Sequence, residues 1–146
     1  MESRIIKRNV ALVEKCTMSS VGIKSLFNTM PDDQYKLHLF SNQPAFSQAM
    51  LKMSFSAVIF SLSAIRTDRR AGLAYLTELA INFPRIKRVV IADDDAEARL
   101  IGSLSPLPLD GVVSKSSSLT VLQDALFTAL NCSSRGTEGS KNHWYI

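Results

Sequence analysis

Four short apolar runs, separated by longer segments with helical spacing, most constrain the fold of this chain. The runs lie at residues 9–14, 57–62, 87–92 and 110–115. Runs of this length and composition are typical of strands that are covered on both faces, as in the centre of a parallel sheet. Residues 35–40, "YKLHLF", instead alternate apolar and polar side chains, which predicts an edge strand with one exposed face.

A helix is predicted after each of these strands. Apolar side chains recur at every third or fourth position in the intervening segments, which is the spacing of one helix face. The expected helices cover residues 18–30, 42–53, 93–104 and 117–131, with a longer one from about residue 70 to the proline at 84. Five strand–helix units joined by right-handed crossovers predict an α/β fold, a doubly wound parallel (βα)5 sheet with strand order 2-1-3-4-5.

Composition indicates a single domain followed by a linker. Of the 146 residues, 46% are hydrophobic and 21% are charged, which is typical of a soluble globular protein. Residues 1–131 are expected to form the domain, and residues 132–146 are polar and rich in Gly and Ser, as in an interdomain linker. The sequence has no run of roughly 18 apolar residues and no secretory signal pattern, so we expect a cytoplasmic protein.

Charged residues and cysteines indicate neither a nucleic-acid surface nor a metal site. The net charge is +4, but the basic residues are scattered apart from small groups at residues 66–70 and 85–88. Neither group has the density or the interleaved aromatic residues of a nucleic-acid surface, so both are expected on solvated helix ends and loops. Cys16 and Cys132 have no disulfide or metal-ligand spacing, which favours two reduced thiols.

The candidate functional residues follow the central strands. The carboxyl ends of parallel strands meet at one edge of the sheet, where such proteins place their ligands. At that edge we expect the residues that follow each strand: Glu14, Lys15 and Cys16, then Ser61, Ser63 and Arg66, then Ala92 and Asp93–Asp95, and finally Lys115.

Neither catalysis nor metal binding is expected from the reactive groups at this rim. A serine nucleophile at Ser61 would need a histidine base within hydrogen-bond reach. The histidines, His38 and His143, lie in the edge strand and in the tail, and no G-x-S-x-G motif is present. The acidic run Asp93–Asp95 is explained by capping of the helix that follows, because a helix N-terminus favours carboxylates. The chain is therefore not expected to be an enzyme.

Four segments carry a family resemblance: "NVALVEKCTMSSVGIKSLF", "VIFSLSAIRTDRRAGL", "FPRIKRVVIADDDAEA" and "LDGVVSKSSSLTVLQDAL". Together with the (βα)5 order, they resemble response-regulator receiver domains, of the kind joined to a LuxR- or FixJ-type helix-turn-helix. The resemblance covers about residues 9–130 and implies the CheY-like, flavodoxin-like receiver fold. A narrower similarity, through "AVIFS", "VIADDD", "EARLIGSLSP" and "WYI", is to a LuxR-type regulator that pairs with the regulator RcsB.

The resemblance implies a degenerate phosphorylation site. In such receivers an aspartate at the end of the third strand is phosphorylated, and two acidic residues after the first strand hold Mg²⁺ with it. A Thr or Ser after the fourth strand and a Lys after the fifth bind the phosphoryl oxygens. Here Ser61 stands at the phosphoacceptor position, Glu14 and Lys15 at the acidic pair, and Ala92 at the Thr/Ser position. Only the lysine is retained, as Lys115.

These departures predict a pseudo-receiver that is not phosphorylated and needs no Mg²⁺. A serine hydroxyl forms no acyl phosphate and gives the metal no anionic oxygen, whereas Mg²⁺ normally takes one or two carboxylates plus phosphate oxygens. The positive charge of Lys15 also disfavours a cation nearby. Lys15 is expected to pair with Glu14 or to occupy the place of the metal. Lys115 is expected to form a hydrogen bond with Ser61 or with a carbonyl at a strand end.

By the same resemblance, the chain is expected to belong to a bacterial transcriptional activator that dimerises without phosphorylation. The implied partner is the receiver domain of RcsB or of a similar regulator, and a homodimer is the alternative. DNA binding is expected only through a C-terminal helix-turn-helix that this chain lacks. The full-length protein is expected at the nucleoid.

The partner surface is expected on the first and fifth helices, and the alternative surface surrounds the fourth helix. Aromatic side chains carry much of the binding energy of interfaces, which makes Phe127 of the fifth helix a candidate contact. Packing of Phe127 into the core of the domain explains this residue equally well. The expected interface residues are Lys24, Asn28, Gln123 and Phe127, and those of the alternative surface are Arg99 and Ser103.

Two other functions compete with this interpretation. In the first, the chain is a ligand-sensing pseudo-receiver that binds a small anion through Lys15, Arg66 and Lys115. In the second, it is a phosphotransfer-competent receiver that uses another acidic residue, such as Asp68 or Asp93.

Overall fold

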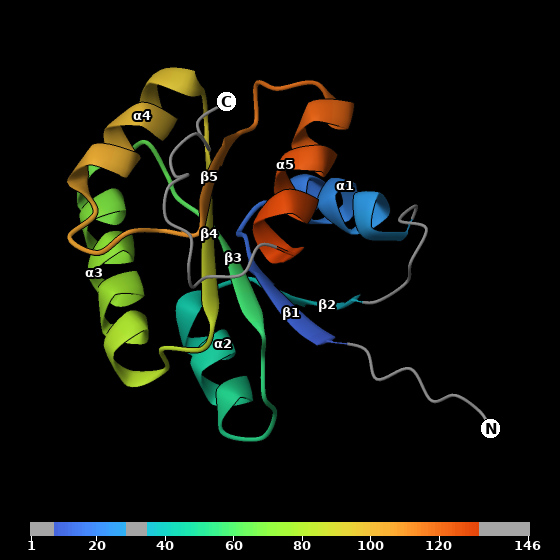
Figure 1. The fold of residues 1–146 in the computed structure, drawn as a ribbon, viewed down its shortest axis with the longest axis vertical. Helices are drawn as coiled ribbons and strands as arrows, with labels where there is room; N and C mark the ends of the chain where they lie inside the picture. Colours follow the sequence, from blue (N-terminus) through green and yellow to red (C-terminus); the bar gives the residue numbers. More distant parts are fainter. Residues whose placement is uncertain (1–7, 29–34, 132–146) are drawn as a thin grey trace.

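The computed structural model describes residues 8–28 and 35–131, in which strands and helices alternate without exception (Figure 1). The strands are β1 (Arg8–Val13), β2 (Tyr35–Phe40), β3 (Ala57–Ser61), β4 (Lys87–Ala92) and β5 (Gly111–Ser114). The helices are α1 (Thr17–Asn28), α2 (Gln43–Met50), α3 (Arg66–Asn82), α4 (Asp95–Leu104) and α5 (Leu119–Asn131). The expected linker, residues 132–146, lies outside the described residues.

All strands pair in parallel, in the order β2-β1-β3-β4-β5. The predicted fold class and strand order are therefore confirmed, including the edge position of the alternating strand β2. In the register, Leu12 of β1 lies opposite both Leu39 of β2 and Ile59 of β3. Helices α1 and α5 cover one face of this sheet, while α2, α3 and α4 cover the other (Figure 1).

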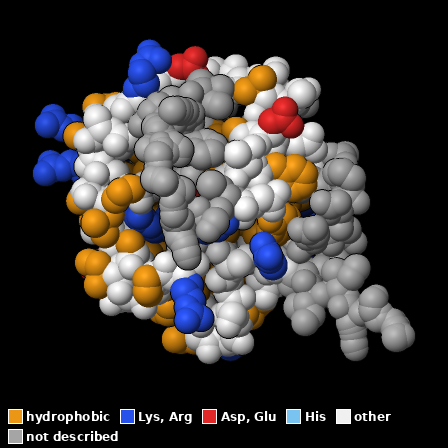
Figure 2. Space-filling model, viewed as in Figure 1, with side chains coloured by type: hydrophobic (Ala, Val, Ile, Leu, Met, Phe, Trp, Pro, Cys, Tyr) orange, Lys and Arg blue, Asp and Glu red, His pale blue; other side chains and the backbone are white. Residues whose placement is uncertain are grey.

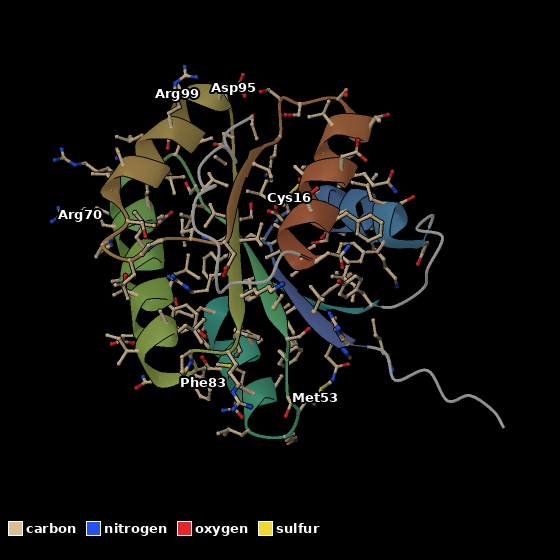
Figure 3. The ribbon with its side chains drawn as sticks, viewed as in Figure 1. Cys16, Met53, Arg70, Phe83, Asp95 and Arg99 are labelled. Carbon is tan, nitrogen blue, oxygen red and sulfur yellow. The ribbon has the colours of Figure 1, made fainter. Side chains whose placement is uncertain are left out.

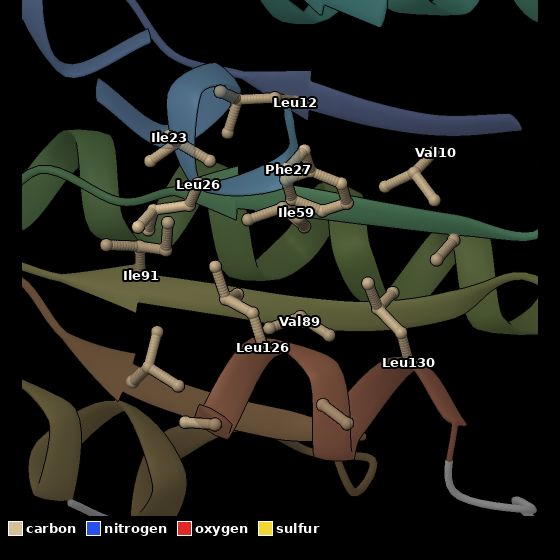
Figure 4. Packing of buried hydrophobic residues seen from close by; sticks show 14 of the residues in the cluster. Val10, Leu12, Ile23, Leu26, Phe27, Ile59, Val89, Ile91, Leu126 and Leu130 are labelled. Carbon is tan, nitrogen blue, oxygen red and sulfur yellow. The ribbon is translucent and has the colours of Figure 1, made fainter. Parts of the chain in front are cut away.

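The two faces of the sheet bury two separate apolar clusters, because successive side chains of a strand point to opposite faces. Alternate residues of the central strands pack against α1 and α5 on one face. On this face, Leu126 and Leu130 of α5 lie over Val89 of β4 (Figure 4). The intervening residues pack against α2, α3 and α4, where Phe46 and Leu76 are fully buried. Burying a leucine side chain completely contributes about 1.5–3 kcal/mol, so these clusters hold the helices on the sheet.

Arg88 is a buried polar residue near the start of β4. Its Nη1 donates to the carbonyl oxygen of Leu76 at 3.1 Å, and its Nη2 donates to the carbonyl oxygen of Pro108. Its backbone N–H donates to Asp110 Oδ2 at 2.7 Å. Burial lowers the pKa of Arg88 and raises the pKa of Asp110. The expectation of a solvated position is wrong for Arg88, because these bonds satisfy its polar atoms inside the protein.

Helix α3 begins at Arg66, earlier than the predicted start near residue 70. Its first turn is polar and exposed, so apolar spacing could not reveal it. Asp68 lies in this turn, where the helix dipole favours a carboxylate. The helix ends at Asn82, so Phe83, which falls within the predicted helical range, lies outside the helix and is 44% exposed.

The surface in Figure 2 carries basic side chains singly rather than as one continuous patch. Arg70 of α3 and Arg99 of α4 both extend outward into solvent (Figure 3). This distribution agrees with the scattered basic residues of the sequence. In the part of the chain that the structure describes, no helix combines the length and the apolar character that crossing a bilayer requires.

Gly111 lets α5 approach the edge strand β5 closely. A Cβ atom at Gly111 would lie 2.9 Å from the Cβ of Ala129, which is fully buried in α5. Gly22 lies in the exposed part of α1 and has free space around it instead. A Cβ atom at Gly22 would have no neighbouring atom within 4 Å outside its own stretch of helix.

The two glycines should therefore respond oppositely to alanine. Gly111→Ala is expected to lower the free energy of unfolding by about 1–3 kcal/mol, because overpacking forces α5 away from β5. Gly22→Ala is expected to raise it by about 0.5–1 kcal/mol, because alanine favours the helix interior. Urea denaturation of both variants measures the difference, and equal stability of Gly111→Ala and the parent chain would contradict the close packing.

Candidate functional site

The five residues of the expected degenerate phosphorylation site lie together at the carboxyl edge of the sheet. Glu14 and Lys15 directly follow β1, Ser61 is the last residue of β3, and Ala92 is the last residue of β4. Lys115 follows β5, and its backbone N–H donates to the carbonyl oxygen of Ala92 at 2.8 Å. The parallel sheet brings them together because all its strands end at the same edge.

Glu14 and Lys115 form an ion pair at this edge. Lys115 Nζ lies 3.3 Å from Glu14 Oε1, and the two side chains are 32% and 6% exposed. The other carboxylate oxygen, Oε2, accepts a hydrogen bond from the backbone N–H of Cys16 at 3.0 Å. Oε1 is buried and accepts no hydrogen bond from a described residue. The Lys115 ammonium therefore compensates the charge of the Glu14 carboxylate as an ion pair, not as a hydrogen-bond donor.

The sequence predicted different partners for the two lysines. Of the two positions predicted for Lys15, a pairing with Glu14 or the place of the metal, the pairing is wrong, because Lys15 is exposed and the ammonium beside Glu14 belongs to Lys115. No hydrogen bond joins Lys115 to Ser61 within the described residues, although its backbone makes the strand-end contact described above. The Lys115 side chain instead reaches across the edge to Glu14, at the end of β1.

Ser61 and Ala92 have surroundings that offer little chemistry. Ser61 is half-buried, and Ala92 is fully buried and has only a methyl group. His38 lies within β2, where its Nε2 is 3.0 Å from Asn9 Oδ1 and burial lowers its pKa. The other histidine, His143, lies outside the described residues. Within those residues, the structure thus brings no histidine base to Ser61.

A cavity of about 440 Å³ opens beside these residues. It extends from the ends of β1 and β3 to the start of α2 and the first turns of α3. Glu14, Lys15, Ser61 and Lys115 lie on its wall, whereas Arg66, proposed with two of them to bind an anion, does not. The remaining lining residues are Val13, Ser41, Asn42, Gln43, Pro44, Phe60, Leu62, Ser63, Asp68, Ala71, Gly72 and Asp93.

The acidic run before α4 caps the helix, as predicted. Asp94 is the N-cap residue, and its Oδ1 accepts a hydrogen bond from the backbone N–H of Glu97 at 2.9 Å. Asp95 Oδ1 accepts one from Ser116 Oγ at 3.3 Å. Nowhere in residues 8–28 and 35–131 do three His, Cys, Asp or Glu side chains gather as they would around a metal ion.

Cys16 is an exposed thiol directly before α1. Hydrogen bonds from the backbone and side chain of Ser19, and from the backbone of Met18, lower its pKa. These donors belong to the first turn of the helix, so the effect is local and does not depend on Lys15. Cys132 lies outside the described residues.

The four predicted partner residues differ in their surroundings. Lys24 and Asn28 of α1 are exposed. Gln123 Nε2 donates to the carbonyl oxygen of Leu26 at 3.2 Å, so this side chain joins α5 to α1. Phe127 is half-buried against the core, with its ring centre 6.2 Å from that of Tyr35. Core packing therefore accounts for Phe127.

Three exposed apolar residues on the same two helices were not predicted. Met18 and Val21 of α1 are 83% and 58% exposed, and Val121 of α5 is 39% exposed. All lie in the first turns of their helices, at the carboxyl edge of the sheet. Helical spacing could have identified them, because each lies outside the buried face of its helix. Arg99 and Ser103 of the alternative surface are also exposed.

The chain matches no family model, but it is similar in sequence to a known protein and in fold to several solved structures. It is 60% identical over 144 residues to "Transcriptional activator protein BglJ" of Escherichia coli (strain K12). The match covers 99% of this chain and 64% of that protein, so the chain spans less than two thirds of its relative.

Similar solved structures are receiver domains and response regulators, at sequence identities that establish the fold alone. A signal receiver domain from Pseudomonas fluorescens Pf-5 matches with a TM-score of 0.69 and 18% identity, covering 89% of this chain and 91% of that one. RcsB from Salmonella enterica serovar Typhimurium, bound to promoter rprA, matches with a TM-score of 0.66 and 19% identity, covering 84% and 60%. A response regulator from Thermotoga maritima has a TM-score of 0.69 and 12% identity, covering 87% and 100%.

The ion pair leads to a stability prediction. Lys115→Met should lower the free energy of unfolding by about 1–3 kcal/mol, because it leaves the Glu14 carboxylate buried without a compensating charge. Glu14→Gln in the same chain should recover part of this loss, which a double-mutant cycle in urea measures. Lys15→Met is the matched control and should change stability by less than about 0.5 kcal/mol. Independent, additive effects of the Glu14 and Lys115 changes would contradict the pairing.

Proposed function

Since this chain has the response-regulator receiver fold and is 60% identical to the activator BglJ over nearly all its length, we propose that it is the pseudo-receiver domain of a bacterial LuxR-type transcriptional activator. It acts by dimerisation and without phosphorylation. Its DNA-reading helix-turn-helix is provided by a further domain, to which residues 132–146 lead as a linker. The activator works in the cytoplasm, at the nucleoid. The domain has no enzymatic role of its own.

The chemistry of the rim supports independence from phosphorylation. Ser61 provides no carboxylate that could form an acyl phosphate. The one carboxylate of the former acidic pair, Glu14, is buried and already paired with Lys115 at 3.3 Å. An arriving Mg²⁺ would have to displace that ammonium and would meet Lys15 beside it, so the residues present do not fit the ion. This ion pair is the observation that carries the proposal.

The proposed partner is the receiver domain of RcsB or of a similar regulator, and the α1–α5 surface is the proposed contact. Met18, Val21 and Val121 provide exposed apolar area there, while Lys24 and Asn28 provide a polar border. An apolar centre with a polar rim is the usual composition of protein interfaces. A homodimer through the same surface is the alternative. The α4 surface, with Leu100 and Leu104 exposed, provides the competing geometry.

Mass measurement of the mixed domains tests the partner. This chain and the RcsB receiver domain, mixed at tens of micromolar without Mg²⁺ or phosphodonor, should form a heterodimer in size-exclusion chromatography with light scattering. Val21→Lys should weaken it by about tenfold or more, because a charge replaces buried apolar area. Leu100→Lys on α4 is the matched control and should leave it unchanged. A complex sensitive only to Leu100→Lys would move the interface to α4, and absence of any complex would contradict the partner.

Restoring the aspartate alone should not restore phosphorylation. In Ser61→Asp, the Glu14–Lys115 pair, Lys15 and Ala92 all remain, so Mg²⁺ lacks its ligands and the phosphoryl group lacks its hydroxyl partner. Incubation with acetyl phosphate and Mg²⁺, followed by intact-mass spectrometry, should show no stable phosphoryl adduct. Adding Lys15→Asp and Ala92→Thr to the variant should increase incorporation. Efficient labelling of Ser61→Asp alone, or of Asp68 or Asp93 in the parent chain, would contradict the proposal.

A further inference from the structure

We propose that the cavity between α2, α3 and the carboxyl edge of the sheet binds a compact, uncharged organic molecule that has an apolar face and a hydroxyl or amide group. This binding activity goes beyond dimerisation and does not depend on it. The observations that carry the proposal are the size of the cavity, its apolar wall, the balance of its charges and the polar groups that have no partner elsewhere.

The cavity has the dimensions of a small-molecule site. Its volume of about 440 Å³ lies within the range of roughly 300–1,000 Å³ that is typical of ligand pockets. Phe60 and Leu62 at the end of β3, Val13 at the end of β1 and Pro44 at the start of α2 form apolar parts of the wall. The cavity thus extends well beyond the former phosphorylation site, into the space between α2 and α3.

Gly72 of α3 helps to shape this wall. A Cβ atom at Gly72 would lie 2.2 Å from Leu62 Cδ2, so a larger residue here would force the Leu62 side chain to move from its present position against the helix. Ala71, its neighbour on α3, is exposed and also lines the cavity. Small residues on this side of the helix therefore leave the space open.

The charges on the wall disfavour an ionic ligand of either sign. Glu14 and Lys115 compensate each other at 3.3 Å. The other charged lining residues, Lys15, Asp68 and Asp93, are all exposed. An anion would meet the two aspartates, and a cation would meet the ammonium groups of Lys15 and Lys115. An uncharged ligand avoids both costs, because it loses no ionic hydration when it enters.

Two half-buried neutral side chains on the wall remain available for hydrogen bonds. Asn42 already accepts from the backbone N–H of Ala45, and Ser63 accepts from that of Ile65. By contrast, the hydroxyl of Ser61 and the side-chain amide of Gln43 are half-buried and make no hydrogen bond to any described residue. Each both donates and accepts, which suits a hydroxyl or an amide on the ligand.

Three probes of the same shape test the charge preference: benzamide, benzoate and benzylamine. Each is titrated into the ¹⁵N-labelled full chain, and amide shifts are followed by NMR. Benzamide should shift the amides of Ser61, Ala71 and Gly72 saturably, with a dissociation constant of about 1–10 mM, as expected for a fragment of this size. Benzoate and benzylamine should bind at least about tenfold more weakly.

Two substitutions on one helix test the location. Ala71→Leu places a larger side chain into the cavity and should weaken benzamide binding by about tenfold. Ala74→Leu, also exposed on α3 but outside the lining, is the matched control and should leave binding unchanged. Ser61→Ala should weaken binding several-fold. Thermal unfolding curves verify that each variant is folded.

The proposal is overturned by any of three results. These are absence of saturable shifts with benzamide, tighter binding of benzoate or benzylamine than of benzamide, and equal effects of Ala71→Leu and Ala74→Leu. Because the probes are added to the isolated chain, failure here leaves the heterodimer experiment unaffected, and failure of the heterodimer leaves this site unaffected.

Discussion

Burial of the central strands on both faces is the constraint on which the rest of the structure depends. Helices cover β1, β3 and β4 from both sides, so nearly every side chain along them must be apolar. Polar side chains are then confined to the strand ends. Because the strands are parallel, Glu14, Ser61 and Lys115 meet at one edge, and the position of the candidate site follows from the way the core is built.

The ion pair between Glu14 and Lys115 gives this edge its character. A buried carboxylate without a cation would be costly, and Lys115 supplies the compensation from within the chain. The charge of the Glu14 carboxylate is therefore compensated without an added ion. This pairing supports the proposal that the domain works without phosphorylation, and it is one reason why the adjoining cavity is proposed to take an uncharged molecule.

The start of α4 is held by residues outside the former phosphorylation site. Arg69 of α3 pairs with Glu97 at 3.2 Å, and Asp95 accepts a hydrogen bond from Ser116. These contacts join α4 to α3 and to the loop after β5. Ala92, at the end of β4, has no hydroxyl to take part.

The sequence alone determined the element order, the strand order and the edge at which the candidate residues lie, because apolar periodicity reports burial directly. It did not reveal the polar first turn of α3, where exposure leaves no apolar spacing. Only the tertiary structure decided that Lys115 rather than Lys15 pairs with Glu14, and that Arg88 is buried with its donors satisfied. Both depend on the direction that a long side chain takes near one end of its strand, and contacts between segments far apart in the chain set that direction.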